Sequence, residues 1–193
     1  MLCILVPSIA LHCPPLPSGA LRCPLRSTLY GTSMNRTGDN LISNSSNKSL
    51  VLELCAEQVE FLVIGGLAVA WYCADRMADD MDLLINPTEP NSEKVIWALS
   101  KLGLQVPPGY SFARLGVQAP LKAIHYADLI TPAKDGLAFD ALNQRAVEAK
   151  LFNFPVKLVG KEDLVALKEH AATAEDSNSK HEEDVRRLIE SAV

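Results

Sequence analysis

The sequence predicts an α/β (α+β) domain: a small mixed β-sheet flanked by helices, with further helices at the C-terminal end. Three observations support this fold class. From Ser49 onward, short apolar runs alternate with segments of helical period. One of the apolar runs ends in Gly65-Gly66, which is typical of a strand passing directly into a helix. After residue 160, only helical patterns follow.

Each expected element rests on its own local pattern. Apolar runs rich in branched residues predict strands over 59–66, 81–86, 121–131 and 154–160. The first of these includes the Gly-Gly turn, and Pro87 ends the second. Apolar residues at helical spacing predict helices over 49–58, 67–76, 87–104, 136–152, 161–175 and 181–193. Ser92 is the expected N-cap of the third helix. Residues 106–116, rich in Pro and Gly, are expected to form a loop.

The first 48 residues differ in composition from the rest. They are rich in Pro, Leu and Cys and show neither helical nor strand period, so we expect a disordered or misassigned extension before a domain at 49–193. Met34 is a plausible alternative start. The apolar beginning is too short to span a membrane, so we expect no membrane partner. A reducing cytoplasm is the expected location. The cysteines at 3, 13, 23, 55 and 73 match no metal-binding spacing.

The charge limits the classes of function. The formal net charge is −5, and no basic segment accompanies the domain. An acidic chain of 193 residues without a basic channel is a poor candidate for a template-directed polymerase or a general nucleic-acid binder.

Two aspartates stand one residue apart in an otherwise apolar strand pattern. Side chains alternate along a strand, so Asp80 and Asp82 are expected to share a face. Like charges this close are tolerated at a solvated strand end, or when a cation bridges them. Mg²⁺ prefers one or two carboxylates together with phosphate oxygens and water. The pair therefore indicates either a solvated strand end or a metal site.

Gly65 and Gly66 supply a second part of the pattern. Glycine lets the backbone approach a ligand closely, and a helix start attracts phosphate. Asp128, near the end of the third expected strand, is the candidate third carboxylate. Asp140 is its rival, but it falls in a helical pattern and is expected to be solvated. His125 is expected to face a neighbouring strand rather than a metal.

The stretch "IGGLAVAWYCADRMADDMDLLIN" resembles the signature of nucleotidyltransferases of the DNA polymerase beta superfamily. It is most similar to the minimal nucleotidyltransferase and abortive-infection (AbiEii-like) toxin branch. The residues that match are Gly65, Gly66, Arg76, Asp80, Asp82, Asp128 in "YADLIT", Lys168 in "LVGKEDLVALKEHA" and Asp184 in "KHEEDVRRL". Ala78 stands where that family has threonine, and Lys180-His181 where it has "KD".

The resemblance implies a nucleotidyltransferase fold and a reaction. Asp80, Asp82 and Asp128 would bind one or two Mg²⁺ ions, and Asp128 would also help to activate an acceptor hydroxyl. The nucleotide would lie against Gly65, Gly66, Arg76 and Lys168.

On the same resemblance, the partners would be an NTP and an acceptor that is a protein, an RNA or a small molecule. A cognate antitoxin or toxin would be a further partner. The alternative that we consider is an inactive module of this fold that binds a partner protein or a nucleotide.

Overall fold

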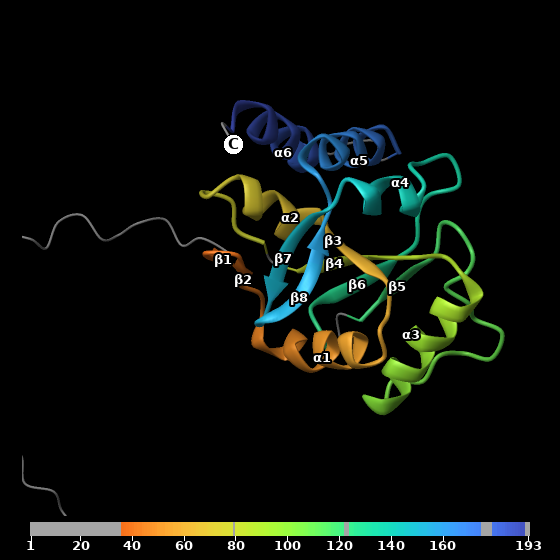
Figure 1. The fold of residues 1–193 in the computed structure, drawn as a ribbon. Helices are drawn as coiled ribbons and strands as arrows, with labels where there is room; N and C mark the ends of the chain where they lie inside the picture. The colour runs from red at the N-terminus through yellow and green to blue at the C-terminus, as the bar shows by residue number, and fades with distance from the viewer. Residues whose placement is uncertain (1–35, 79, 122–123, 175–178, 192–193) are drawn as a thin grey trace, which may run out of the picture. The chain divides into compact units, whose positions relative to one another are not determined.

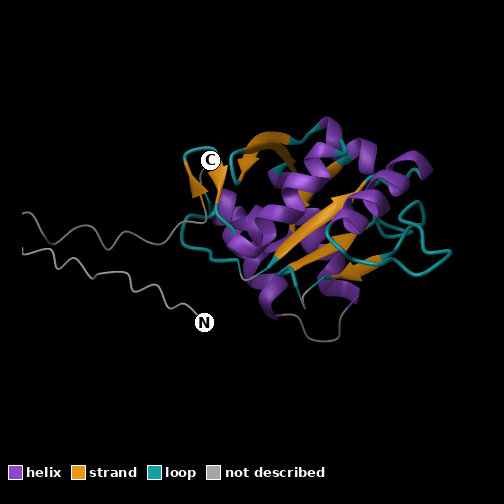
Figure 2. Cartoon of the chain, turned by 90° about the horizontal axis from the view of Figure 1, so that it is seen from below, coloured by secondary structure: helices purple, strands orange, loops and turns teal. Residues whose placement is uncertain are grey.

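The centre of the molecule is a mixed β-sheet, seen in a computed structural model that describes residues 36–78, 80–121, 124–174 and 179–191. Within these residues the sheet has eight strands in the order β1-β2-β7-β8-β3-β4-β6-β5. Figure 2 shows the strands with helices packed around them. The strands are β1 (Arg36–Thr37), β2 (Asn40–Leu41), β3 (Phe61–Ile64), β4 (Met81–Ile85), β5 (Gln118–Pro120), β6 (Ala127–Ile130), β7 (Val147–Leu151) and β8 (Phe154–Leu158).

Helices cover the sheet on both sides. Figure 1 shows α2, α5 and α6 on one side, and α1 and α3 on the other. The helices are η1 (Ser45–Asn47, a short 3-10 helix), α1 (Lys48–Ala56), α2 (Gly65–Tyr72), α3 (Glu89–Lys101), α4 (Phe139–Gln144), α5 (Lys161–Ala174) and α6 (Ser179–Glu190). Together with the C-terminal helices, this confirms the predicted fold class.

The central strands and the helix between them form the core. β3 and β4 have neighbours on both edges, so they read as almost continuous apolar runs. α2 is apolar on all sides because it is enclosed by the sheet and by α5 and α6, and five of its eight residues are buried. The turn between β3 and α2 is therefore held rigidly on both sides.

The prediction of one helix over 136–152 is wrong in its second half. α4 ends at Gln144, and Val147–Leu151 is strand β7, which forms a hairpin with β8. Glu, Ala, Lys and Leu favour a helix locally, but pairing on both edges of β7 outweighs that preference. Phe152 and Asn153 form the turn with φ of 52° and 71°, values that suit a two-residue hairpin. A Phe-Asn pair is a weak signal for such a turn, so the sequence pattern did not reveal it.

The N-terminal boundary also needs a correction. Residues 36–48, expected to precede the domain, contribute β1, β2 and η1 to it. β2 pairs in parallel with β7, and Leu41 is buried. Strands of two residues are too short to show an alternation, which explains why the pattern gave no sign of them. The expected disorder of the chain before residue 36 lies outside the described residues.

Two smaller expectations were also wrong. The strand expected over 121–131 is limited to β6, and β5 lies before it. The N-cap of α3 is Thr88, whose hydroxyl accepts from the Asn91 amide, whereas Ser92 lies inside the helix. The Ser92 hydroxyl instead accepts from the Phe112 backbone amide, which ties the 106–116 loop to α3.

No helix among the described residues is long and apolar enough to span a membrane.

Candidate functional site

The turn from β3 into α2 can be built only with glycine at its first position. Gly65 has a φ of +66°, a backbone conformation that other L-residues rarely adopt. A Cβ on Gly65 would lie 1.9 Å from Oδ2 of Asp82. This close approach follows from the register, which places Ile64 opposite Asp82 in the antiparallel pair β3–β4. The glycine turn and the Asp82 carboxylate therefore form one packed unit.

Gly66 is under a weaker constraint. A Cβ there would lie 3.5 Å from Nη2 of Arg76 and 3.6 Å from Cβ of Ala78, both ordinary contact distances. The two glycines thus differ in role: Gly65 makes room for a carboxylate, and Gly66 brings the helix start next to a guanidinium.

The predicted carboxylates come from adjacent strands. Asp82 on β4 and Asp128 on β6 are direct partners in a parallel pair, so their side chains share a face of the sheet. Asp80 lies directly before β4, two residues from Asp82. Asp128 is only 4% exposed, and its Oδ2 accepts a hydrogen bond from Nε2 of Gln118 on β5, 3.1 Å away. The fold thus places the predicted carboxylates Asp82 and Asp128 side by side on adjacent strands, with Asp80 two residues before Asp82 in the chain.

The donors at this place suit a hard cation. Among the described residues, the structure has no set of three or more His, Cys, Asp and Glu side chains gathered as a preformed metal cage. Mg²⁺ usually takes one or two carboxylates and completes its shell with substrate phosphates and water. The oxygen donors of Asp80, Asp82 and Asp128 are of the kind that this pattern requires.

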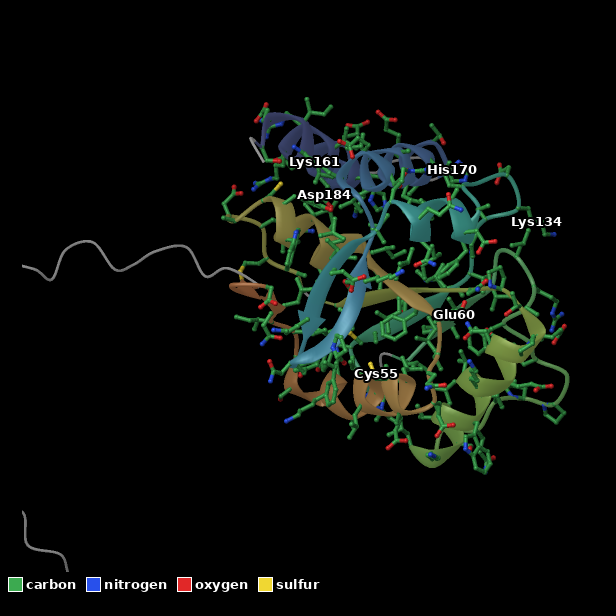
Figure 3. All side chains as sticks on the ribbon, viewed as in Figure 1. Cys55, Glu60, Lys134, Lys161, His170 and Asp184 are labelled. Atoms are coloured by element: carbon green, nitrogen blue, oxygen red, sulfur yellow. The ribbon has the colours of Figure 1, made fainter. Side chains whose placement is uncertain are left out.

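Arg76 and Lys168, the predicted nucleotide-binding cations, both pair with Asp184 on α6. Nε of Arg76 lies 2.8 Å from Oδ1 of Asp184, and Nζ of Lys168 lies 2.9 Å from Oδ2. The three side chains are 14%, 8% and 1% exposed, respectively. We call Arg76, Lys168 and Asp184 the ion cluster. It joins the segment after α2 to α5 and α6, where Figure 3 labels Asp184.

The ion cluster has an excess of positive charge. Burial by itself would raise the pKa of Asp184, but the contacts from Arg76 and Lys168 outweigh it and hold that pKa below its ordinary value. Two cations share one carboxylate, and Nη2 of Arg76 is the atom that lies beside Gly66. The site therefore combines aspartates on the sheet with positive charge next to the glycine turn.

Asp184 had no assigned role in the sequence-based prediction beyond matching a motif. A signal was present, because Asp184 and the buried Leu188 are four residues apart on α6 and so share a face. An aspartate on the apolar face of a helix requires a buried partner. The identity of that partner depended on tertiary packing, since Arg76 lies 108 residues away in the chain.

Of the two remaining candidates, Asp140 is exposed as expected, whereas His125 contacts a short helix and not the neighbouring strand that the sequence suggested. Asp140, the rival third carboxylate, is exposed on the first turn of α4. His125 is buried, and its Nδ1 lies 2.8 Å from the carbonyl oxygen of Ser46 on η1. Tyr72 packs against the core and donates to the carbonyl of Val159, and burial raises its pKa to about 12. These contacts give His125 and Tyr72 structural roles.

Comparison with solved structures identifies the fold as that of nucleotidyltransferases. ANT(2″)-Ia in complex with adenylyl-2″-tobramycin is 18% identical with a TM-score of 0.50, over 72% of this chain and 83% of that one. The lincosamide antibiotic adenylyltransferase LnuA in its lincomycin-bound form is 16% identical with a TM-score of 0.53, over 78% and 98%. No protein-family model matches the sequence, and no curated protein matches it. The predicted nucleotidyltransferase fold is confirmed.

Proposed function

We propose that this protein is a Mg²⁺-dependent nucleotidyltransferase that moves a nucleoside monophosphate from an NTP to a hydroxyl acceptor. The observation that carries the proposal is the packed unit of Gly65 and Asp82, with Asp128 beside it on β6. A turn that accepts only glycine against a carboxylate, with a second carboxylate in register on the next strand, is an arrangement that suits the binding of a divalent cation.

In this reaction the acceptor hydroxyl oxygen attacks the α-phosphorus of the NTP. The bond from that phosphorus to the oxygen bridging to the β-phosphate breaks, and pyrophosphate leaves with the electron pair. Asp128 takes the hydroxyl proton as general base. Mg²⁺, held by Asp80, Asp82 and Asp128 in one or two ions, would supply positive charge to the triphosphate. Asp80 and Asp82 thus orient the donor, and Asp128 prepares the acceptor.

The nucleotide would lie at the glycine turn. Gly66 brings the start of α2 next to Nη2 of Arg76, and the ion cluster carries one more positive than negative charge. Positive charge arranged in advance, next to the place where a polyphosphate lies, stabilises both the bound donor and the leaving pyrophosphate. Arg76 and Lys168 would act in this way while they remain paired with Asp184.

The biological setting belongs to the same proposal. The sequence motifs resemble the AbiEii-like toxin branch, which would place the protein in a toxin–antitoxin or phage-defence pair with a cognate partner protein. The acceptor would then be a protein, an RNA or a small molecule. The structures of ANT(2″)-Ia with adenylyl-2″-tobramycin and of LnuA with lincomycin support a small-molecule acceptor.

A second candidate is an inactive module of this fold that binds a partner or a nucleotide. Two observations favour it: Ala78 lies next to Gly66, where the related motif has a threonine, and both predicted phosphate-binding cations are already paired with Asp184. Under this reading the aspartates bind no metal that serves a reaction.

Titration calorimetry separates the two candidates. ATP, GTP and CTP are titrated with and without Mg²⁺ into the wild type and into the double variant Asp80→Asn, Asp82→Asn. We expect Mg²⁺-dependent binding of at least one NTP by the wild type and a loss of about 100-fold or more in the variant, because removing the metal-binding carboxylates leaves the triphosphate charge uncompensated. A folded wild type that binds none of the three would favour the inactive module.

A further inference from the structure

A cavity of about 520 Å³ lies next to the aspartates. Its base is formed by Ile64, Leu84 and Ile130 from β3, β4 and β6, and α5 covers it with Ala166 and Leu167. The segment after β6 closes the remaining side. Its volume falls within the range of roughly 300–1,000 Å³ that is usual for small-molecule sites.

The cavity and the aspartates lie on the same face of the sheet. Leu84 follows Asp82 by two residues on β4, and Ile130 follows Asp128 by two residues on β6, so each pair points the same way. Gln118 makes the connection direct, because it lines the cavity and also donates to Oδ2 of Asp128. A molecule in the cavity would therefore lie against Gln118, one hydrogen bond away from the carboxylate proposed as general base.

The lining of the cavity selects for uncharged ligands. Among its described residues, Asp135 is the one carboxylate, and it lies on the rim with 82% of its side chain exposed. Its Oδ1 is 3.5 Å from Nε2 of His170, the basic side chain of the lining, which is labelled on α5 in Figure 3. The buried Thr131 hydroxyl already donates to the carbonyl of Arg114. A polycationic ligand would lose its hydration here without gaining carboxylate partners.

We propose that this cavity holds the acceptor, and that the acceptor is a hydroxyl compound with an uncharged, largely apolar body. The inference rests on the proposed nucleotidyl transfer. The apolar body would lie against Ile64, Leu84 and Ile130, and the hydroxyl would point along the sheet toward Asp128. The nucleotide would occupy the other side of Asp82, at the glycine turn.

The test uses 2-(2-naphthyl)ethanol, a neutral fluorescent alcohol, titrated into the full chain. Ala166→Phe fills the cavity from α5, and Leu137→Glu places a charge in the segment after β6. Glu169→Phe is the matched control, because it adds the same ring to the same helix at an exposed position outside the lining. Binding of Mg²⁺ and ATP is measured on every variant as a separate readout.

We expect the wild type to bind the probe, both cavity variants to weaken that binding by about ten-fold or more, and the control to stay within about two-fold. Mg²⁺-dependent ATP binding should stay unchanged in all three variants, and adenosine should not displace the probe. The use of two cavity variants, one of them in a loop, protects the result against a single misfolded protein.

Three results would overturn the proposal. The first is that the wild type does not bind the probe, or that Ala166→Phe and Glu169→Phe bind it equally. Either finding would rule out the acceptor site. If the same proteins still bound ATP with Mg²⁺, the proposed function would stand. Displacement by adenosine would make the cavity a nucleoside site. A wild type that binds the probe but no NTP would end the acceptor role, because the proposed function itself would have failed.

Discussion

Asp128 and Asp184 are both buried carboxylates, but their surroundings are opposite. Asp184 lies between the cations of Arg76 and Lys168. Asp128 accepts from the neutral amide of Gln118 and stands in register with a second carboxylate, Asp82. The first arrangement neutralises a charge within the fold and so stabilises it. The second places two carboxylates side by side in the sheet, which suits a place where a divalent cation binds.

The largest expected effect is the loss of stability when the carboxylate of the ion cluster is removed. Asp184→Asn leaves two buried cations without their anion, and breaking a buried pair in this way costs about 3–5 kcal/mol. We expect that loss in the free energy of unfolding, measured by urea denaturation at neutral pH. Glu182→Gln, at an exposed position on the same helix, is the matched control and should change stability little. A loss below about 1 kcal/mol in Asp184→Asn would show that the cluster does not hold α6 in place.

The glycine turn should show the next largest effect. Gly65→Ala combines a positive φ with a Cβ 1.9 Å from Oδ2 of Asp82, so either the turn or the carboxylate must move. We expect a loss of about 2–3 kcal/mol in stability, together with loss of Mg²⁺-dependent nucleotide binding.

Gly66→Ala is the control for that variant, because its Cβ meets neighbours at ordinary distances. Its stability should stay within about 1 kcal/mol of the wild type, since alanine also favours the helix. If Gly65→Ala and Gly66→Ala lost the same stability, the short distance between residue 65 and the Asp82 carboxylate would not be the reason for glycine at position 65.

The smallest expected effect is the change with pH in the stability that Asp184 contributes, and it occurs only at acid pH. The contacts from Arg76 and Lys168 hold the pKa of folded Asp184 below its ordinary value of 3.8, so the unfolded chain takes up this proton first as pH falls. The stabilisation is complete above that ordinary value and is lost as pH falls through the lower, folded pKa. The stability difference between wild type and Asp184→Asn, followed by denaturation across this range, should therefore shrink with acidification. A constant difference would contradict the charged state of Asp184.

Much of the candidate site could be predicted because its parts are close in the chain. The run from β3 through Gly65-Gly66 and α2 to β4 shows its apolar pattern, its turn residues and its spaced aspartates within one short stretch. Asp128 was found because it lies in an apolar strand pattern in the same way, and the structure places it second in β6, as Asp82 is second in β4. The β7–β8 hairpin was missed because its helix-forming residues and Phe-Asn turn carry little local information, and pairing with distant strands decides its state.

The sequence by itself determined the nucleotidyltransferase fold class and the short-range geometry of the glycine turn and the paired aspartates, since these depend on backbone preferences and on the alternation of side chains along a strand. Only the tertiary structure decided that Arg76 and Lys168 meet on Asp184, and that an apolar cavity opens beside Asp128. Ion pairs and cavities form between side chains from elements far apart in the chain, so no local pattern carries them. Packing of α5 and α6 against each other and against α2 brings the members of the ion cluster together.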